Sequence, residues 1–422
     1  MISAAFLLAY SAAIIGAAAE QRLPISDCSR RGVMLLPVRA ESPPALQRQN
    51  TLVGPDWRLR RRLATPFPTE PLTQKETSMR TDLEKRFEEL TALVDRNSVP
   101  NINALWRIAK DIDLIKLNIK FFGYEIARQL AAALPIRQGL APSHIGLQSK
   151  ASTQSDLESD WVAYWASELK VPVVFHRKLW ELTYVLQALW EHGCVEHGKR
   201  GLGFGCGVEP IPSYLASRDV AVTVTDLPPE HGAKIGWQNT NQYTATLEHA
   251  YHAALVDRDR FAKYVSLEYV DMNAIPATLR DYDFCWSVCA LEHVGSIKQG
   301  LAFIENSLNT LRPGGLAIHT TEYNYANDDV TIDNWGTVLF QRQHFNALAE
   351  RLRTNGHRVA ELDFSVGDKI LDRFIDLPPF AHDMTAVQQA YWARDSNHIK
   401  VAVDGFASTC FGLIIQKSTP LR

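Results

Sequence analysis

Apolar residues recur every three or four positions along residues 81–130. Residues 81–95 mix them with Glu, Lys and Arg, which predicts an amphipathic surface helix. A second helix is predicted from Leu105 toward Phe122, where Gly123 marks either a break or a close contact. A third helical stretch continues to Leu130. This part of the chain is therefore expected to be helical.

A polar linker at 138–155 is followed by a second helical pattern that is rich in aromatic residues. Between Trp161 and Trp190, tryptophans, leucines and valines recur at helical spacing. The pattern ends at His192 and Gly193, and a glycine is typical just after the last turn of a helix. We expect the tryptophans to lie in the core.

Beyond Gly193 the pattern changes to short apolar runs that alternate with helical stretches. The runs are 201–204, 220–225, 267–270, 282–288, 316–320, 357–364 and 409–416. Strands that alternate with helices predict βαβ units and a parallel sheet covered on both faces. The predicted fold is α/β: a doubly wound, mostly parallel, seven-stranded Rossmann-like sheet with an N-terminal helical region. Such a sheet binds ligands at the carboxyl ends of its strands.

The 422 residues exceed one ordinary domain. We divide the chain into residues 1–78, a helical region at 79–193 that forms a lid or an oligomer contact, and a catalytic domain at 194–422. Residues 21–78 are rich in Pro and Arg and lack a sustained period, which is typical of a disordered segment. Translation that starts at Met79 is the alternative.

The uncharged, Ala-rich stretch at 2–19 is about long enough to cross a bilayer, so a membrane anchor, a signal peptide or neither stays open. No basic residue precedes Phe6, which argues against export. If the stretch spans a membrane, the arginines after it would hold the rest of the chain in the cytoplasm. The predicted location is cytoplasmic.

A net charge of -3 gives no basic excess, so nucleic acid is not an expected partner. The six cysteines are spread singly without a C-x-x-C pair, and we interpret them as reduced thiols. Cys285 and Cys289 fall in an apolar run, where a free cysteine behaves as a small hydrophobic residue. No residues have a convincing metal-ligand spacing, and no metal is assigned.

The first predicted strand runs directly into a glycine-rich turn, and strand and turn together span 201–210. Glycine lets a ligand approach the backbone closely, and the helix that follows points its free N–H groups at the site. The turn departs from the dinucleotide fingerprint, because Val208 or Pro210 stands where the third glycine belongs. A nicotinamide-dependent oxidoreductase is therefore a disfavoured alternative.

Acidic residues end the next two predicted strands. Asp226 follows the strand at 220–225, where a carboxylate can accept hydrogen bonds from both hydroxyls of a ribose. Asp271 follows the strand at 267–270, where it can accept from an adenine amino group while Met272 packs on the ring. For Asp226 alone, an ordinary cap or turn aspartate before Leu227 is the alternative. Two such acids after a glycine-rich turn favour a nucleoside ligand.

Together with the glycine-rich turn and these acids, the run 282–294 and the Leu-Arg-Pro-Gly-Gly turn at 311–315 resemble class I S-adenosylmethionine-dependent methyltransferases. The resemblance covers roughly half of the chain. More narrowly, the stretches at 175–180, 203–210 and 319–322 are similar to uncharacterised bacterial members of the family that are often associated with glycan biosynthesis. It implies S-adenosyl-L-methionine as cofactor. The cofactor-binding residues it implies are Gly205, Cys206, Gly207, Asp226, Leu227, Asp271 and Met272.

The sequence departs from the family pattern at two positions. Most members carry an acid where this chain has Gly203, and a third glycine where it has Glu209. Glu209 either faces the ammonium group of the cofactor or points away from it. A catalytically degenerate cofactor-binding scaffold is therefore an alternative to an enzyme.

A methyl group on a sulfonium is already activated, so transfer to a hydroxyl needs an aligned acceptor and a base. Glu292 and His293 follow the fourth predicted strand of the domain, and His319 and Glu322 follow the fifth. His293 is the first choice because histidine titrates near neutral pH, with a structural role in its loop as the alternative. The resemblance thus implies O-methylation of a small molecule or glycan, less favourably N-methylation, by an enzyme that could form a homo-oligomer.

Overall fold

The computed structural model describes residues 102–228, 246–380, 384–393 and 397–419. The predicted helix at 81–95, the apolar stretch at 2–19 and the rest of residues 1–101 lie outside them. The described residues from 112 onward belong to one compact unit. No helix among the described residues is long and apolar enough to cross a bilayer.

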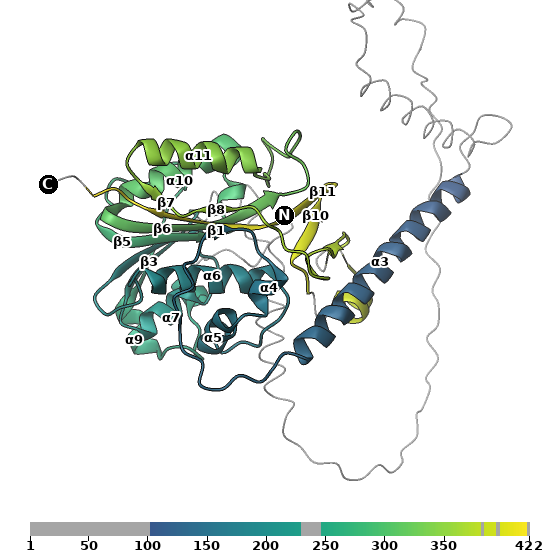
Figure 1. The fold of residues 1–422 in the computed structure, drawn as a ribbon, viewed down its shortest axis with the longest axis horizontal. Coiled ribbons are helices and arrows are strands. Elements are labelled where there is room, and N and C mark those ends of the chain that lie inside the picture. Colours follow the sequence, from purple (N-terminus) through teal and green to yellow (C-terminus); the bar gives the residue numbers. More distant parts are fainter. Residues whose placement is uncertain (1–101, 229–245, 381–383, 394–396, 420–422) are drawn as a thin grey trace, which may run out of the picture. The chain divides into compact units, whose positions relative to one another are not determined.

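A mixed, largely parallel sheet organises the described chain (Figure 1). In spatial order its strands are β4 (Val265–Tyr269), β3 (Ala221–Asp226), β2 (Arg200–Phe204), β5 (Tyr282–Val288), β6 (Leu311–Asn324), β11 (Phe406–Gln416), β10 (Lys400–Val403) and β9 (Ile375–Asp376), with β7 (Arg358–Val359) also paired to β11. The strands from β4 to β6 are parallel, and β11 is antiparallel to β6. The strand order reverses between β2 and β5, and such a switch point opens a binding crevice at the carboxyl ends of the strands.

The prediction of seven strands differs from the structure, because the sheet has nine strands in the part of the chain that the structure describes. The predicted run at 357–364 splits into β7 and β8 (Leu362–Asp363), and β8 pairs with β1 (Ser149–Lys150) in a separate small sheet. β9 and β10 were missed since strands of two and four residues are too short to show a period.

Helices cover both faces of the sheet (Figure 1). One face carries α10 (Ile297–Ser307) and α11 (Arg342–Thr354), and the other carries α5 (Asp160–Glu168), α6 (Arg177–Glu191), α7 (Ile211–Ser217) and α9 (Arg258–Tyr264). The shorter helical elements are α4 (Gln154–Leu157), η3 (Leu247–Ala250), η4 (Leu291–His293), η5 (Leu308–Thr310), α12 (Ala386–Gln388) and η7 (Gln389–Ala393).

The aromatic-rich helical pattern forms two helices, α5 and α6, which pack against the sheet in one hydrophobic core. Trp165 and Trp180 are fully buried there, which confirms the prediction that the tryptophans lie in the core. α6 ends at Glu191 with His192 as its C-cap, and Gly193 follows with φ of +66°, as the predicted helix end requires. Every residue of α6 from Arg177 to Leu189 is buried, and this brings charged side chains into the interior.

The second and third predicted helical stretches are one helix, α3 (Ile102–Ala132), so the prediction of a separate third stretch is wrong. Gly123 marks close packing and no break, because a Cβ at this position would lie 2.2 Å from the Phe374 ring. Lys120 and Tyr124 anchor the same face of the helix, with Lys120 Nζ 2.5 Å and Tyr124 Oη 2.7 Å from the carboxylate of Asp376.

Candidate active site

The glycine-rich loop after β2 meets the ends of two other strands. Gly205 has φ of +59°, a conformation that suits glycine. A Cβ on Gly205 would lie 2.8 Å from Cβ of Ala290, after β5, and 3.6 Å from Sδ of Met272, after β4. Gly207, at φ +53°, continues the turn into α7. The loops after β2, β4 and β5 therefore converge at the carboxyl edge of the sheet.

The two predicted acids lie at the same edge, on adjacent strands. Asp226 is the last residue of β3 and pairs in register with Tyr269, two positions before Asp271. Asp226 Oδ1 accepts a hydrogen bond from Leu227 N at 2.8 Å, and Asp271 Oδ1 accepts one from Asn273 N at 2.8 Å. Both carboxylates are half-buried. Local backbone bonds thus hold the two acids in place at the edge.

The two departures from the family pattern occupy one region of the structure. A Cβ on Gly203 would lie 2.2 Å from Sγ of Cys206 and 2.5 Å from the Trp286 ring, so an acidic side chain does not fit at this position. Glu209 is only 3% exposed, and its Oε1 accepts a hydrogen bond from Trp286 Nε1 at 2.6 Å. Its side chain therefore points inward, toward the indole that packs on Gly203.

Burial raises the pKa of Glu209 to about 8, although the bond from Trp286 favours the ionised form. At neutral pH this carboxyl is mostly protonated. A cation bound nearby would favour its ionised form.

Glu292 lies in η4 and is fully buried. Its Oε2 accepts a hydrogen bond from Thr321 Oγ1 at 3.1 Å, while its Oε1 is buried without a hydrogen-bond partner. Burial, and then the nearby carboxylate of Glu322, raise the pKa of Glu292 to about 8. A carboxyl with a pKa near the working pH is well suited to accept a proton.

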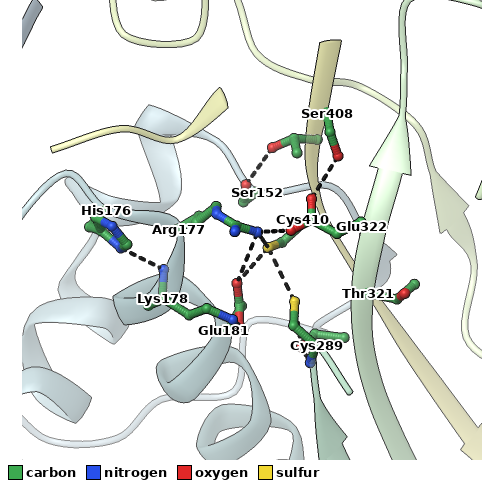
Figure 2. Close-up of polar contacts among 12 residues, drawn as sticks. Ser152, His176, Arg177, Lys178, Glu181, Cys289, Thr321, Glu322, Ser408 and Cys410 are labelled. Atoms are coloured by element: carbon green, nitrogen blue, oxygen red, sulfur yellow. Dashed lines mark hydrogen bonds and ion pairs between the residues drawn. The ribbon is translucent and has the colours of Figure 1, made fainter. Parts of the chain in front are cut away.

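Figure 2 shows a buried charge network between α6 and β6, next to Thr321, the hydrogen-bond partner of Glu292. We define it as Arg177, Lys178 and Glu181 of α6 together with Glu322 of β6. Arg177 pairs with Glu322, and Lys178 Nζ lies 2.8 Å from Glu181 Oε2. Glu322 Oε2 also accepts a hydrogen bond from Ser408 Oγ at 2.7 Å. Two cations thus balance two carboxylates.

Glu322 and Glu292 have different roles, because Glu322 belongs to the charge network and Glu292 does not. Burial would raise the pKa of Glu322, but Arg177 and Ser408 bring it below its usual value. Glu322 is therefore an ionised partner of Arg177, whereas Glu292 forms no ion pair with any residue that the structure describes and is bonded to the Thr321 hydroxyl. Of the two, Glu292 is the better proton acceptor.

Some atoms of this region could also bind a metal ion. Donor atoms of Glu181, Cys289 and Cys410, and those of Cys289, Glu292 and Glu322, lie within 4.8 Å of one another. Glu181 and Glu322 are already paired with Lys178 and Arg177, and these cations would repel a bound metal. We therefore interpret these carboxylates as partners of the two basic side chains.

His293, the first choice for the base, is tied to the loop beside it. Its Nδ1 lies 2.9 Å from the Gly336 carbonyl oxygen and 3.2 Å from Thr337 Oγ1. Burial lowers its pKa to about 4, so the imidazole is neutral at physiological pH. These contacts favour the structural alternative, in which His293 fixes the loop that contains Gly336.

The His293→Ala variant is accordingly expected to lose stability more than catalysis. Loss of the bond to Gly336 should cost about 1–3 kcal/mol and lower the melting temperature by several degrees. Turnover at a temperature where the variant is folded should fall less than roughly tenfold, well below the loss typical of a missing base. Thermal melting and initial rates on this variant check the prediction, and an unchanged melting temperature with about 100-fold slower turnover would instead make His293 the base.

His319 does not reach the edge. It lies within β6, fully buried, with Nδ1 2.8 Å from Ser287 Oγ and Nε2 3.1 Å from Ser307 Oγ. Burial lowers its pKa to about 3. We therefore assign His319 a packing role in the core.

No protein-family profile and no curated protein matches the sequence. Among solved structures, the chain is similar to the [4+2]-cyclase SpnF, at 17% identity over 65% of this chain and 100% of that chain, with a TM-score of 0.37. It is also similar to an S-adenosylmethionine dependent methyltransferase from Mesorhizobium loti, at 13% identity over 55% and 98% of the two chains, with a TM-score of 0.31. A third similar structure is that of N-methyltransferase NodS from Bradyrhizobium japonicum WM9, at 14% identity over 55% of this chain and 93% of that chain, with a TM-score of 0.29.

The sequence interpretation missed the charge network and the surroundings of Cys289. Cys289 was expected to act as a small apolar residue, but its Sγ lies 3.6 Å from Sγ of Cys410, beside Glu181. Cys289 also has φ of +47°, which is uncommon for a residue with a Cβ. The available signal was the basic pair Arg177–Lys178 in an otherwise apolar helix, because charged residues are rarely buried unless they are paired.

Proposed function

We propose that this chain is an S-adenosylmethionine-dependent methyltransferase that acts on an oxygen of a small molecule or glycan. The observation that carries the proposal is the convergence of three loops at the switch point. The glycine-rich loop meets Met272 and Ala290, and Asp226 ends the strand between β2 and β4. A nucleoside with a charged tail fits such an edge, since it needs acids at strand ends and a close approach to the backbone.

Each part of the edge has a separate role in this proposal. Asp226 accepts hydrogen bonds from the two ribose hydroxyls, and Leu227 packs beside the nucleoside. Asp271 accepts from the adenine amino group, and Met272 packs on the adenine. Gly205, Cys206 and Gly207 form the turn under the amino acid tail of the cofactor. The bound cofactor supplies a methyl group that is already activated.

Glu292 is the proposed base. It lies two positions after Ala290, whose Cβ bounds the space at Gly205, so it is close to the proposed cofactor site in the chain and in space. Ionised Glu292 accepts the proton of the acceptor hydroxyl while the charge network keeps Glu322 occupied. Because Glu292 is fully buried here, an acceptor can reach it only after neighbouring side chains move.

Glu209 is proposed to supply the carboxylate that position 203 lacks and to bind the ammonium group of the cofactor. Because Glu209 is 3% exposed and bonded to Trp286, the two groups can meet only after neighbouring side chains move. The affinity for S-adenosylmethionine should then rise with pH between about 6 and 7.5, because ionisation of the carboxyl increases there while the amino group of the cofactor is still charged. At about pH 7.5, Glu209→Gln should bind the cofactor roughly tenfold more weakly than the wild type and should lose part of this rise. Isothermal titration between about pH 6 and 7.5 measures both, and a variant that keeps the wild-type slope and affinity would show that Glu209 does not meet the cofactor.

Label transfer tests the proposed reaction and identifies the acceptor. The full chain is incubated with methyl-labelled S-adenosylmethionine and fractionated pools of small molecules and glycans. We expect label in an acceptor as a methyl ether or ester. Label on nitrogen would correct the acceptor atom. Cofactor binding without transfer to any pool would favour the degenerate scaffold.

A further inference from the structure

The helix α3 is apolar on two opposite faces. Its inner face packs against the segment that contains Phe374 and Asp376, and Leu117, Tyr124 and Ala127 on this face are buried. An ordinary amphipathic surface helix has a single apolar face, and here that face is already covered.

The outer face carries a second apolar row that the rest of the compact unit leaves exposed. Its exposed fractions are Ile112 46%, Ile115 57%, Ile119 40%, Phe122 62% and Ile126 36%. The residues are spaced by three and four positions in alternation, and Leu105 and Ile108 continue the same spacing in the sequence. A row sustained over three heptads is the pattern of a coiled-coil seam.

The heptad positions favour a second copy of this chain as the partner. The row fills positions a and d, mostly with Ile, which packs well as knobs into the holes of a facing helix. Asp111 then falls at position g and Lys116 at the following e position. In a parallel pair of identical helices these positions face each other, so opposite charges would meet across the seam.

The length of the predicted helix at 81–95 argues against this segment as the occupant of the whole row. A helix of 15 residues extends about 22 Å. To cover the row, this helix would have to fold back through the six connecting residues and lie along α3 from its start. Phe122 lies about 30 Å along α3 from Ile102. Phe122 and Ile126 would therefore stay uncovered.

We propose that α3 associates with α3 of a second copy of this chain through the outer row at Ile112, Ile115, Ile119, Phe122 and Ile126. The association buries apolar side chains that are otherwise exposed to water, which stabilises the assembly. This proposal is independent of methyl transfer, because none of these residues belongs to the candidate active site.

Light scattering on the full chain after size-exclusion chromatography tests the proposal. The expected mass is twice the 47.4 kDa of one chain, or a higher multiple, since Ile at both a and d also suits more than two helices. Ile115→Lys places a charge in the seam and should weaken association at least about tenfold, as Phe122→Lys should too. Leu114→Lys is the matched control, because Leu114 is also 57% exposed but lies outside the row.

Three outcomes would overturn the proposal. The wild type could be a monomer throughout the micromolar range, the two seam variants could leave the mass unchanged, or Leu114→Lys could dissociate the assembly as strongly as Ile115→Lys. All substituted side chains are exposed in one copy, so circular dichroism should show that the variants are folded.

Discussion

Replacement of Glu292 with Gln is expected to lower kcat about 100-fold or more while the affinity for S-adenosylmethionine changes little. The amide keeps the shape of the side chain and its contact with Thr321 but cannot accept a proton. General base catalysis typically contributes a factor of this size. Initial rates at saturating cofactor, together with isothermal titration of the cofactor, measure the two effects separately.

The pH profile makes this prediction specific to a base. Because Glu292 must lose its proton to act, the wild-type rate should increase as the pH rises through about 8 and then level off. Glu292→Gln should show a low rate without that increase. Glu305→Gln is the matched control, since Glu305 forms only a surface ion pair with Arg351 and the change should leave the rate near that of the wild type. A Glu292→Gln enzyme with more than roughly half of the wild-type kcat would remove Glu292 from the chemistry.

The sequence predicted the central parallel strands β2 and β5 well because these two strands are buried on both faces. The run at 282–288 coincides with β5, whose residues are almost all fully buried, and the run at 201–204 lies within β2. Buried parallel strands are continuous apolar runs, and these are easy to find in a sequence. The short strands β9 and β10, of two and four residues, lack this signal.

The positions of Asp226 and Asp271 could be predicted for the same reason. Once the strands are known, the residues that follow them must lie at the carboxyl edge. Contacts between distant segments could not be predicted in this way. The pairing of Arg177 with Glu322 joins residues 145 positions apart, and only the packing of α6 against β6 and β11 brings them together. The orientation of Glu209 likewise depends on Trp286, which no local pattern links to it.

Asp226→Asn is expected to weaken the binding of S-adenosylmethionine by at least about tenfold. The carboxylate ends β3 at the edge where the ribose would lie, and a hydrogen bond to a charged group contributes about 1.5–3 kcal/mol. Asn keeps the shape and can still accept one hydrogen bond from Leu227 N, so the fold should be retained. Isothermal titration gives the dissociation constants, and thermal melting checks the fold.

Asp219→Asn is the control for this variant. Asp219 precedes the other end of β3, at φ +60°, which Asn tolerates, and its carboxylate pairs with Arg260. The affinity of this control for the cofactor should stay within about twofold of the wild type, because its ion pair is partly exposed. If Asp226→Asn also stays within about twofold, Asp226 does not bind the ribose.

The release of S-adenosylhomocysteine tests the central claim, which is that this edge of the sheet transfers a methyl group. The full chain is given S-adenosylmethionine with and without the acceptor pools, and the product is quantified by mass spectrometry over time. We predict release that depends on an acceptor. In the Glu292→Gln variant at saturating cofactor, the rate of release should be lower by a factor of about 100 or more. Tight cofactor binding without any acceptor-dependent release, or equal release by the wild type and Glu292→Gln, would contradict the account.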